Sequence, residues 1–232
     1  MLSSAVFFAL PPHRLRVALR HHFFARCYDT ATWPAERIYF DGHRRALTID
    51  LTGPVLEIGT GTGAMMPYFA AERSSGNEFE LWAIEPDPYM RARAHQRVEQ
   101  ENLAVHLIGA RAESLPFPAD YFSCVIASMV FCTITDPGRV LEEVRRILRP
   151  GGELRLFEHV AAHGWSHRFQ RLISPIWQRL AGGCRPTRRT DQRILSHPAF
   201  EPISVTTYPI IAPPIRPFVR GRFRLVETRP ED

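Results

Sequence analysis

The sequence contains no lysine: its 232 residues include 29 basic ones, and every one of them is arginine. A Schiff-base mechanism needs a lysine amine, and the P-loop signature of nucleotide triphosphatases needs its lysine. Neither chemistry is therefore available to this chain. The net charge is +5, but the arginines form no long basic block, which favours an anionic surface partner over nucleic acid.

Long apolar runs and closely spaced cysteines are also missing. No run approaches the roughly 18 residues that a membrane-spanning helix requires. The short apolar opening, residues 1–14, has no basic residue ahead of it, so we expect it to pack on the protein or touch a membrane rather than act as a secretory signal. Cys27, Cys124, Cys132 and Cys184 lie far apart without a CxxC pair. This spacing predicts no metal site and indicates free thiols in a reducing, cytoplasmic setting.

The middle of the chain alternates short apolar segments with amphipathic ones. We expect strands at 54–58, 79–85, 103–109, 121–129 and 152–160, and helices at 64–73, 86–101 and 136–152. Such alternation predicts an α/β fold with a doubly wound, mostly parallel sheet. A helical stretch at 165–183, interrupted at Ser174–Pro175, precedes strand-like pieces at 203–210 and 222–228. Residues 1–48 are expected to form an N-terminal helical cap on a domain at 49–232, with 165–183 as a lid.

A glycine-rich loop follows the first expected strand. Gly59, Gly61 and Gly63 stand in "VLEIGTGTG", directly before an expected helix. Ligands of open α/β sheets bind beyond the carboxyl ends of the strands, and glycine allows the backbone to approach them closely. Glu85 ends the second strand, where an acidic residue binds a ribose hydroxyl in dinucleotide sites. The pattern predicts a nucleoside ligand.

Glu57 distinguishes between nucleosides. The loop departs from GxGxxG, and Glu57 lies two residues before its first glycine. A carboxylate at a buried strand end is costly unless it meets a donor. Backbone N–H groups of the loop or the ammonium of an amino acid would supply one, whereas a pyrophosphate would not.

Four segments in order resemble class I S-adenosylmethionine-dependent methyltransferases: "VLEIGTGTG", "AIEPD", "RAESLPFPADYFSCVIAS" and "VLEEVRRILRPGGELRLFEHV". The resemblance covers residues 50–160 and implies a seven-stranded Rossmann-like sheet with S-adenosylmethionine as cofactor. It also implies the cofactor-binding residues Tyr28, Glu57, Gly59, Thr60, Gly61, Gly63, Glu85, Pro86, Ala112, Glu113, Ala127 and Ser128. In the family these groups hold the amino-acid end, the ribose, the adenine and the sulfonium side in turn, with Tyr28 in a capping segment. Thr60 and Ser123 depart from the family's usual proline and aspartate.

The later segment is similar to a subgroup that includes membrane-associated thiol methyltransferases. The similarity rests on Glu158–His159–Val160, Trp177, Gly183–Cys184 and Thr187–Arg188. The long apolar N-terminal anchor of the membrane-bound members is not seen in this sequence.

Four side chains are candidates for the acceptor side. His159, at the end of the fifth strand, is expected either to remove a proton from the acceptor or to serve as a hydrogen-bonded structural residue. Cys132 is expected to line the substrate pocket or fill the core, and Cys184 to lie in a pocket or loop. Trp177 belongs to an apolar helical face, with Leu172, Ile173, Ile176 and Leu180, that either packs on the sheet or roofs the substrate.

These patterns predict methyl transfer from S-adenosylmethionine to a small, largely apolar acceptor through sulfur or oxygen. The enzyme alternative is a phospholipid or quinone acceptor, favoured by the basic, apolar 165–183 region, which could also contact a membrane peripherally. The non-enzyme alternative is an inactive cofactor-binding partner subunit. Nucleic-acid methylation is disfavoured because "ASMVFC" replaces the polar-Pro-Pro-aromatic signature after the fourth strand.

Overall fold

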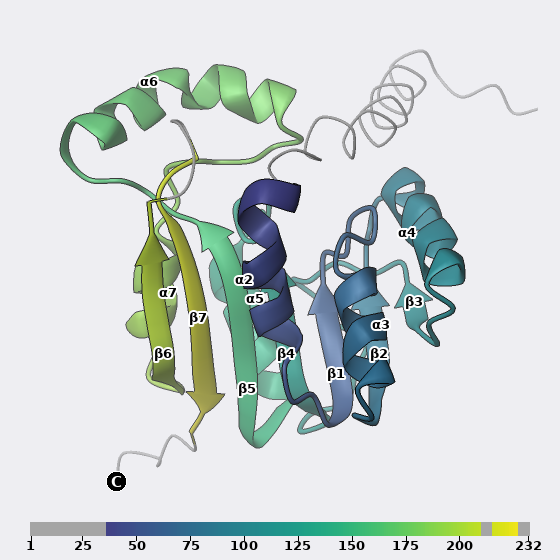
Figure 1. Ribbon diagram of the computed structural model, residues 1–232. Helices are drawn as coiled ribbons and strands as arrows, with labels where there is room; N and C mark the ends of the chain where they lie inside the picture. The colour runs from purple at the N-terminus through teal and green to yellow at the C-terminus, as the bar shows by residue number, and fades with distance from the viewer. Residues whose placement is uncertain (1–35, 210–214, 227–232) are drawn as a thin grey trace, which may run out of the picture.

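The computed structural model describes residues 36–209 and 215–226. Its strands, drawn as arrows in Figure 1, are β1 (Gly53–Ile58), β2 (Phe79–Ile84), β3 (His106–Ile108), β4 (Phe122–Ser128), β5 (Leu148–His159), β6 (Phe200–Tyr208) and β7 (Phe218–Leu225). Its helices are the π-helical turn η1 (Glu36–Phe40), α2 (Asp41–Thr48), α3 (Met66–Ser74), α4 (Pro88–Gln100), α5 (Pro137–Ile147), α6 (Gly164–Leu180) and α7 (Thr190–Leu195).

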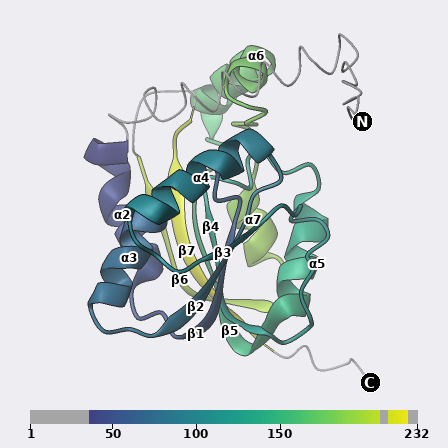
Figure 2. The same cartoon turned by 90° about the vertical axis from the view of Figure 1, so that its right-hand side faces the viewer.

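The strands form one seven-stranded sheet in the order β3-β2-β1-β4-β5-β7-β6. Strands β1 to β5 are parallel, and β7 runs antiparallel to both of its neighbours. The predicted doubly wound, mostly parallel fold is therefore confirmed. Figures 1 and 2 show α2 and α3 on one face of the sheet, α5 and α7 on the other, and α6 above the carboxyl ends of the parallel strands.

Local sequence explains where the helices begin. The carboxylate of Asp87 accepts hydrogen bonds from the backbone N–H groups of Tyr89 and Met90, at 2.8 and 3.1 Å, and so caps α4. Asp136 caps α5 in the same way, and Pro137 occupies the first helical position, where no N–H is needed. The buried side of α5 carries Val140, Leu141, Val144 and Ile147, as its helical spacing predicts.

Several predicted boundaries change. Helix α5 ends at Ile147 rather than 152, because β5 already begins at Leu148. The third strand covers only His106–Ile108, at the edge of the sheet, where β2 is its sole partner in the described residues. The predicted break at Pro175 is wrong, since α6 continues through it. Pro175 has no N–H to donate to the carbonyl of Arg171 in the preceding turn. Both residues are exposed, so water can bond that carbonyl instead.

Helix α2 is attached to the sheet. The buried guanidinium of Arg155, on β5, donates to the carbonyl oxygen of Leu47 at 3.1 Å. Tyr68, on α3, donates its hydroxyl to Asp41 at 3.0 Å. The described part of the predicted N-terminal cap thus lies against β5 and α3, near the carboxyl edge where the glycine loop begins. Among the described residues, no helix is long and apolar enough to cross a membrane.

Candidate active site

The glycine loop connects β1 to α3 at the carboxyl edge of the sheet. Gly59, Gly61 and Gly63 have φ angles of 67°, 58° and 84°, the left-handed region in which glycine alone is unstrained. A Cβ on Gly59 would lie 2.2 Å from Cγ2 of Val130, so glycine is also required there sterically. The backbone N–H groups of Gly59 and Thr60 donate to the carbonyl of Ile84 at 2.9 and 3.1 Å, which joins the loop to β2.

Glu85 follows β2 and faces the loop. Its two carboxylate oxygens accept hydrogen bonds from the N–H of Gly61, at 3.0 Å, and from the N–H of Asp87, at 2.9 Å. Burial raises the pKa of Glu85 despite these two donors. The structure thus brings together the loop and the acidic residue that the sequence predicted as one nucleoside site.

Glu57 lies under the same loop and is buried. Its carboxylate accepts a hydrogen bond of 2.6 Å from the hydroxyl of Thr60. Burial raises the pKa of Glu57 to about 7, against the opposing effects of the Thr60 hydroxyl and the Arg44 charge. A cation that binds beside this buried carboxyl group would stabilise its charged form.

Arg44 is a site residue that the sequence patterns did not indicate. It projects from α2, is 4% exposed, and donates from Nη1 to the hydroxyl of Ser128 at 3.2 Å. Its charge also acts on Glu57, so it links the end of β1 to the end of β4. No motif marks Arg44, because "DGHRRALT" reads as an ordinary amphipathic helix.

The other predicted cofactor residues differ in exposure. Ala112 and Ala127 are buried, whereas Pro86 is exposed at the start of the turn into α4. Glu113 accepts a hydrogen bond from the N–H of Thr135 at 3.2 Å and so ties the Ala112 loop to the segment after β4. Tyr28 lies outside the described residues.

The predicted acceptor-side residues converge on Cys184, in the loop after α6. Nε2 of His159 lies 3.0 Å from Sγ of Cys184, and the indole N–H of Trp177 donates to the same sulfur at 3.3 Å. The hydrogen bond from the Cys132 thiol and that from His159 lower the pKa of Cys184 to about 4. The structure therefore joins His159, Cys132 and Trp177 into one cluster, with Cys184 at its centre.

His159 is fully buried in this arrangement. Its Nε2 faces Cys184 rather than an open crevice, and its backbone N–H donates to Glu158 Oε1 at 3.1 Å. Its predicted role as a catalytic base, like the substrate contacts of Cys132 and Trp177, stays a prediction.

Helix α6 presents its apolar stripe outward. Leu172, Ile176 and Leu180 are 76%, 62% and 72% exposed, whereas Gln170 and Ser174 are buried on the opposite side. Gln170 explains this orientation, because its side chain accepts from the N–H of Ala162 and donates to the carbonyl of Arg216. The expectation that this stripe packs on the sheet is therefore wrong for these three residues.

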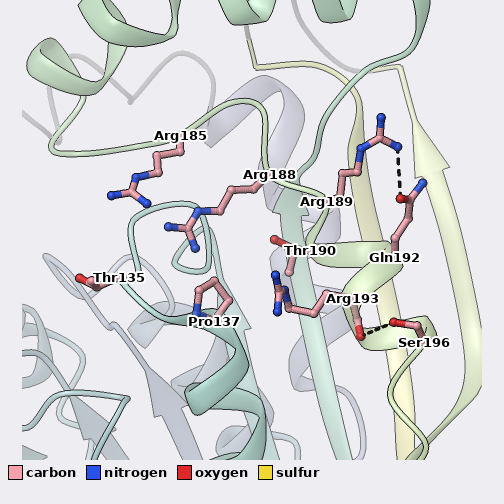
Figure 3. A pocket seen from close by; sticks show the side chains of 9 residues that line it. All are labelled: Thr135, Pro137, Arg185, Arg188, Arg189, Thr190, Gln192, Arg193 and Ser196. Carbon is pink, nitrogen blue, oxygen red and sulfur yellow. Dashed lines mark hydrogen bonds between the residues drawn. The ribbon is translucent and has the colours of Figure 1, made fainter.

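A basic cavity lies beside α7, away from the glycine loop. Its volume is about 740 Å³, and its lining comprises Thr135, Pro137, Arg185, Arg188, Arg189, Thr190, Gln192, Arg193 and Ser196. Figure 3 shows Arg185 and Arg188 extending from the segment after α6 toward Thr135 and Pro137. No basic block in the sequence is long enough to mark this concentration of arginines, which suits an anionic group.

Comparison with known proteins finds similarity to methyltransferases. Residues 56–156 match the family described as "Methyltransferase domain". The chain is 30% identical to human thiol S-methyltransferase TMT1B over 167 residues, covering 70% of this chain and 64% of that protein. It is also 30% identical to the ubiquinone/menaquinone biosynthesis C-methyltransferase UbiE of Pectobacterium atrosepticum, covering 61% and 58%. The chain thus spans less than two thirds of either relative.

Solved structures show the same fold. An S-adenosylmethionine-dependent methyltransferase from Thermotoga maritima matches with a TM-score of 0.62 and 20% identity, covering 88% of this chain and 98% of that one. Geranyl diphosphate C-methyltransferase from Streptomyces coelicolor, in complex with S-adenosyl-L-homocysteine, matches with a TM-score of 0.61 and 13% identity, covering 80% and 78%. The chain thus has the α/β fold of these methyltransferases, with a glycine loop at the carboxyl edge of its sheet. Within this fold, residues 56–156, which carry the glycine loop and Glu85, match the methyltransferase domain family.

Proposed function

We propose that this protein transfers the methyl group of S-adenosylmethionine to the sulfur of a small, largely apolar thiol. The observation that carries this proposal is the similarity to thiol S-methyltransferase TMT1B, which covers 70% of the chain and so extends well beyond the domain match at 56–156. The cofactor supplies the reactive carbon, and the protein aligns the nucleophile with it and excludes water.

The proposed cofactor site uses the glycine loop and the two buried glutamates. Glu57 would accept the ammonium of the amino-acid end, and Glu85 the ribose hydroxyls. One oxygen of Glu85 accepts the Gly61 N–H at 3.0 Å and so holds the loop in shape. The carboxylate can accept further hydrogen bonds from a ligand at the same time. An intact loop with both carboxylates favours an active enzyme over an inactive partner subunit.

A second candidate function is methylation of a lipid-borne acceptor such as a quinone or phospholipid. The exposed apolar stripe of α6 favours it, because Trp165 is 81% exposed and Arg168 and Arg171 are exposed on the same helix. An apolar face flanked by arginines suits peripheral contact with an anionic membrane. A thiol acceptor that partitions into the lipid would use the same surface. The free cysteines Cys124, Cys132 and Cys184 support a reducing, cytoplasmic setting.

Methyl-transfer assays with labelled S-adenosylmethionine separate these acceptors. We expect purified protein to methylate small apolar thiols and to leave matched phenols, quinones and phospholipids unlabelled. Glu57→Gln serves as the control that binds the cofactor poorly. Label transfer to a quinone or phospholipid, with none to any thiol, would replace the thiol proposal with the lipid-borne one.

Vesicle sedimentation tests the membrane contact separately. The double variant Leu172→Ser with Ile176→Ser removes two exposed apolar side chains of α6 and should reduce binding to anionic vesicles about tenfold or more. Turnover of a water-soluble thiol should be unchanged, since both side chains are exposed. Equal vesicle binding by the double variant and the unmodified protein would contradict the contact.

A further inference from the structure

A cluster of two sulfurs and one imidazole lies at the carboxyl end of β5. Cys132 comes from the loop after β4, His159 from the end of β5, and Cys184 from the loop after α6. One ligand atom of each residue lies within 4.8 Å of the others. We propose that Cys132, His159 and Cys184 together bind one soft divalent metal ion, for which Zn²⁺ is the fitting chemistry.

The backbone holds the three segments together. The N–H of Arg185 donates to the carbonyl of Cys132 at 3.0 Å, and the N–H of Ala161 donates to the carbonyl of Arg188 at 2.7 Å. These bonds fasten the segment after α6 to the loop after β4 and to the chain beyond β5. The ligand set is thus positioned by the fold rather than by one flexible loop.

The donor set and its dimensions suit zinc. Zinc binds Cys sulfur at about 2.3 Å and His nitrogen at about 2.0–2.1 Å, so tetrahedral ligand atoms lie roughly 3.5–3.8 Å apart. The present separation of 3.0 Å between His159 Nε2 and Cys184 Sγ would need to open by only about 0.5 Å. Rotation of the buried side chains by a few tenths of an ångström each would achieve this.

The surroundings also favour a cation. Cys132, His159 and Cys184 are 3%, 0% and 8% exposed, and the neighbouring Glu158 is 1% exposed. The Glu158 carboxylate accepts from the N–H of Cys132 at 3.3 Å, so a further acidic group is buried against the two sulfurs. Buried acidic groups of this kind are normally paired with a cation or bound to a metal.

A hydrogen bond beside the cluster points the same way. The indole N–H of Trp177 donates to Cys184 Sγ at 3.3 Å, a bond that would orient a metal-bound sulfur. Because Trp177 lies on α6, the ion would also connect that helix to the sheet.

Three protein ligands are the number that catalytic zinc sites use, with the fourth position open to water or substrate. A thiol bound at that position would have its pKa lowered by the ion and would lose its proton to solvent. The thiolate sulfur would then take the methyl group from the sulfonium, leaving S-adenosylhomocysteine. This last step rests on the proposed thiol acceptor, whereas metal binding does not. As a ligand, His159 would position the ion instead of acting as a base.

Metal binding is measured on the full chain without cofactor or acceptor, so its failure is distinct from failure of methyl transfer. The reduced, chelator-treated protein is titrated with Co²⁺ and then Zn²⁺, followed by absorbance and by elemental analysis after desalting. We expect about one ion per chain and a sulfur-to-cobalt charge-transfer band that Zn²⁺ abolishes. This part of the test needs no variant and does not depend on whether a variant folds.

Matched variants locate the site. Cys132→Ser and Cys184→Ser should each lower the affinity for Zn²⁺ at least about tenfold and remove the charge-transfer band. Cys124→Ser is the control, because Cys124 is also buried but lies within β4 and outside the cluster. Binding of S-adenosyl-L-homocysteine confirms that each variant is folded. The proposal is overturned if the unmodified protein gives no charge-transfer band, or if Cys124→Ser loses the ion as completely as the cluster variants do.

Discussion

The ionisation of Glu57 should control cofactor binding near neutral pH. Burial raises its pKa to about 7 in the ligand-free protein. A carboxyl with that pKa is about half ionised at pH 7 and about one hundredth ionised at pH 5. The α-ammonium of the cofactor stays protonated over this interval because its pKa is near 8. Acidification therefore removes the negative partner and leaves the positive one.

The expected loss of affinity follows from these fractions. If only the carboxylate receives the ammonium, the affinity for S-adenosyl-L-homocysteine falls about fiftyfold from pH 7 to pH 5. A charge-assisted hydrogen bond contributes about 1.5–3 kcal/mol, so binding by the neutral carboxyl levels off about ten- to a hundredfold weaker. Together these limits predict a fall of about fivefold to fiftyfold from pH 7 to pH 5.

Isothermal titration calorimetry at several pH values measures this directly. Glu57→Gln should bind more weakly at pH 7 and should lose most of the pH dependence. Glu85→Gln is the matched control, since it also removes a buried carboxylate of the site but keeps the step near pH 7. The reasoning is refuted if Glu57→Gln shows the same fall in affinity between pH 7 and pH 5 as the unmodified protein.

The same pKa predicts the sign of a stability change in the ligand-free protein. Glu57 holds its proton more tightly when folded, because its pKa rises from 4.5 to about 7. The free energy of unfolding should therefore fall as pH rises from about 4.5 to 7, by up to about 3 kcal/mol. Urea denaturation should show this slope in the unmodified protein and a smaller one in Glu57→Gln. Equal slopes in the two proteins would contradict the assigned burial of the charge.

Three further substitutions test the site. Gly59→Ala places a Cβ 2.2 Å from Val130 Cγ2 at a φ of 67°. We expect it to lower the free energy of unfolding by about 2 kcal/mol or more, measured by thermal or urea denaturation. A Cβ on Gly61 would meet nothing within 4 Å, so Gly61→Ala should lower the free energy of unfolding by less. Glu85→Ala should weaken S-adenosyl-L-homocysteine binding about ten- to a hundredfold by calorimetry, and unchanged affinity would remove it from the site. Trp177→Phe should raise the KM of the acceptor without changing cofactor affinity, because it removes only the N–H to Cys184; an equal effect on both ligands would argue against an acceptor-side role.

Local patterns were sufficient to predict the glycine loop and its contact with Glu85. The strand, the glycine turn and the following helix occupy adjacent residues, so their geometry depends mainly on short-range backbone preferences. Gly59 and Gly63 show positive φ, and Glu85 meets the N–H of Gly61, as the order of the segments predicts. Parallel strands that share one carboxyl edge bring these neighbouring loops together in any such fold.

The cluster around Cys184 was decided by tertiary structure. Residues 132, 159 and 184 have no recognisable spacing, and only the packing of three separate segments places their side chains within 4.8 Å. Arg44 reaches Ser128 across 84 positions of the chain for the same reason. Helical periodicity shows that α6 has an apolar stripe, but not which side of the helix faces the protein. The hydrogen bonds of the buried Gln170 made that choice and turned Leu172 and Ile176 outward.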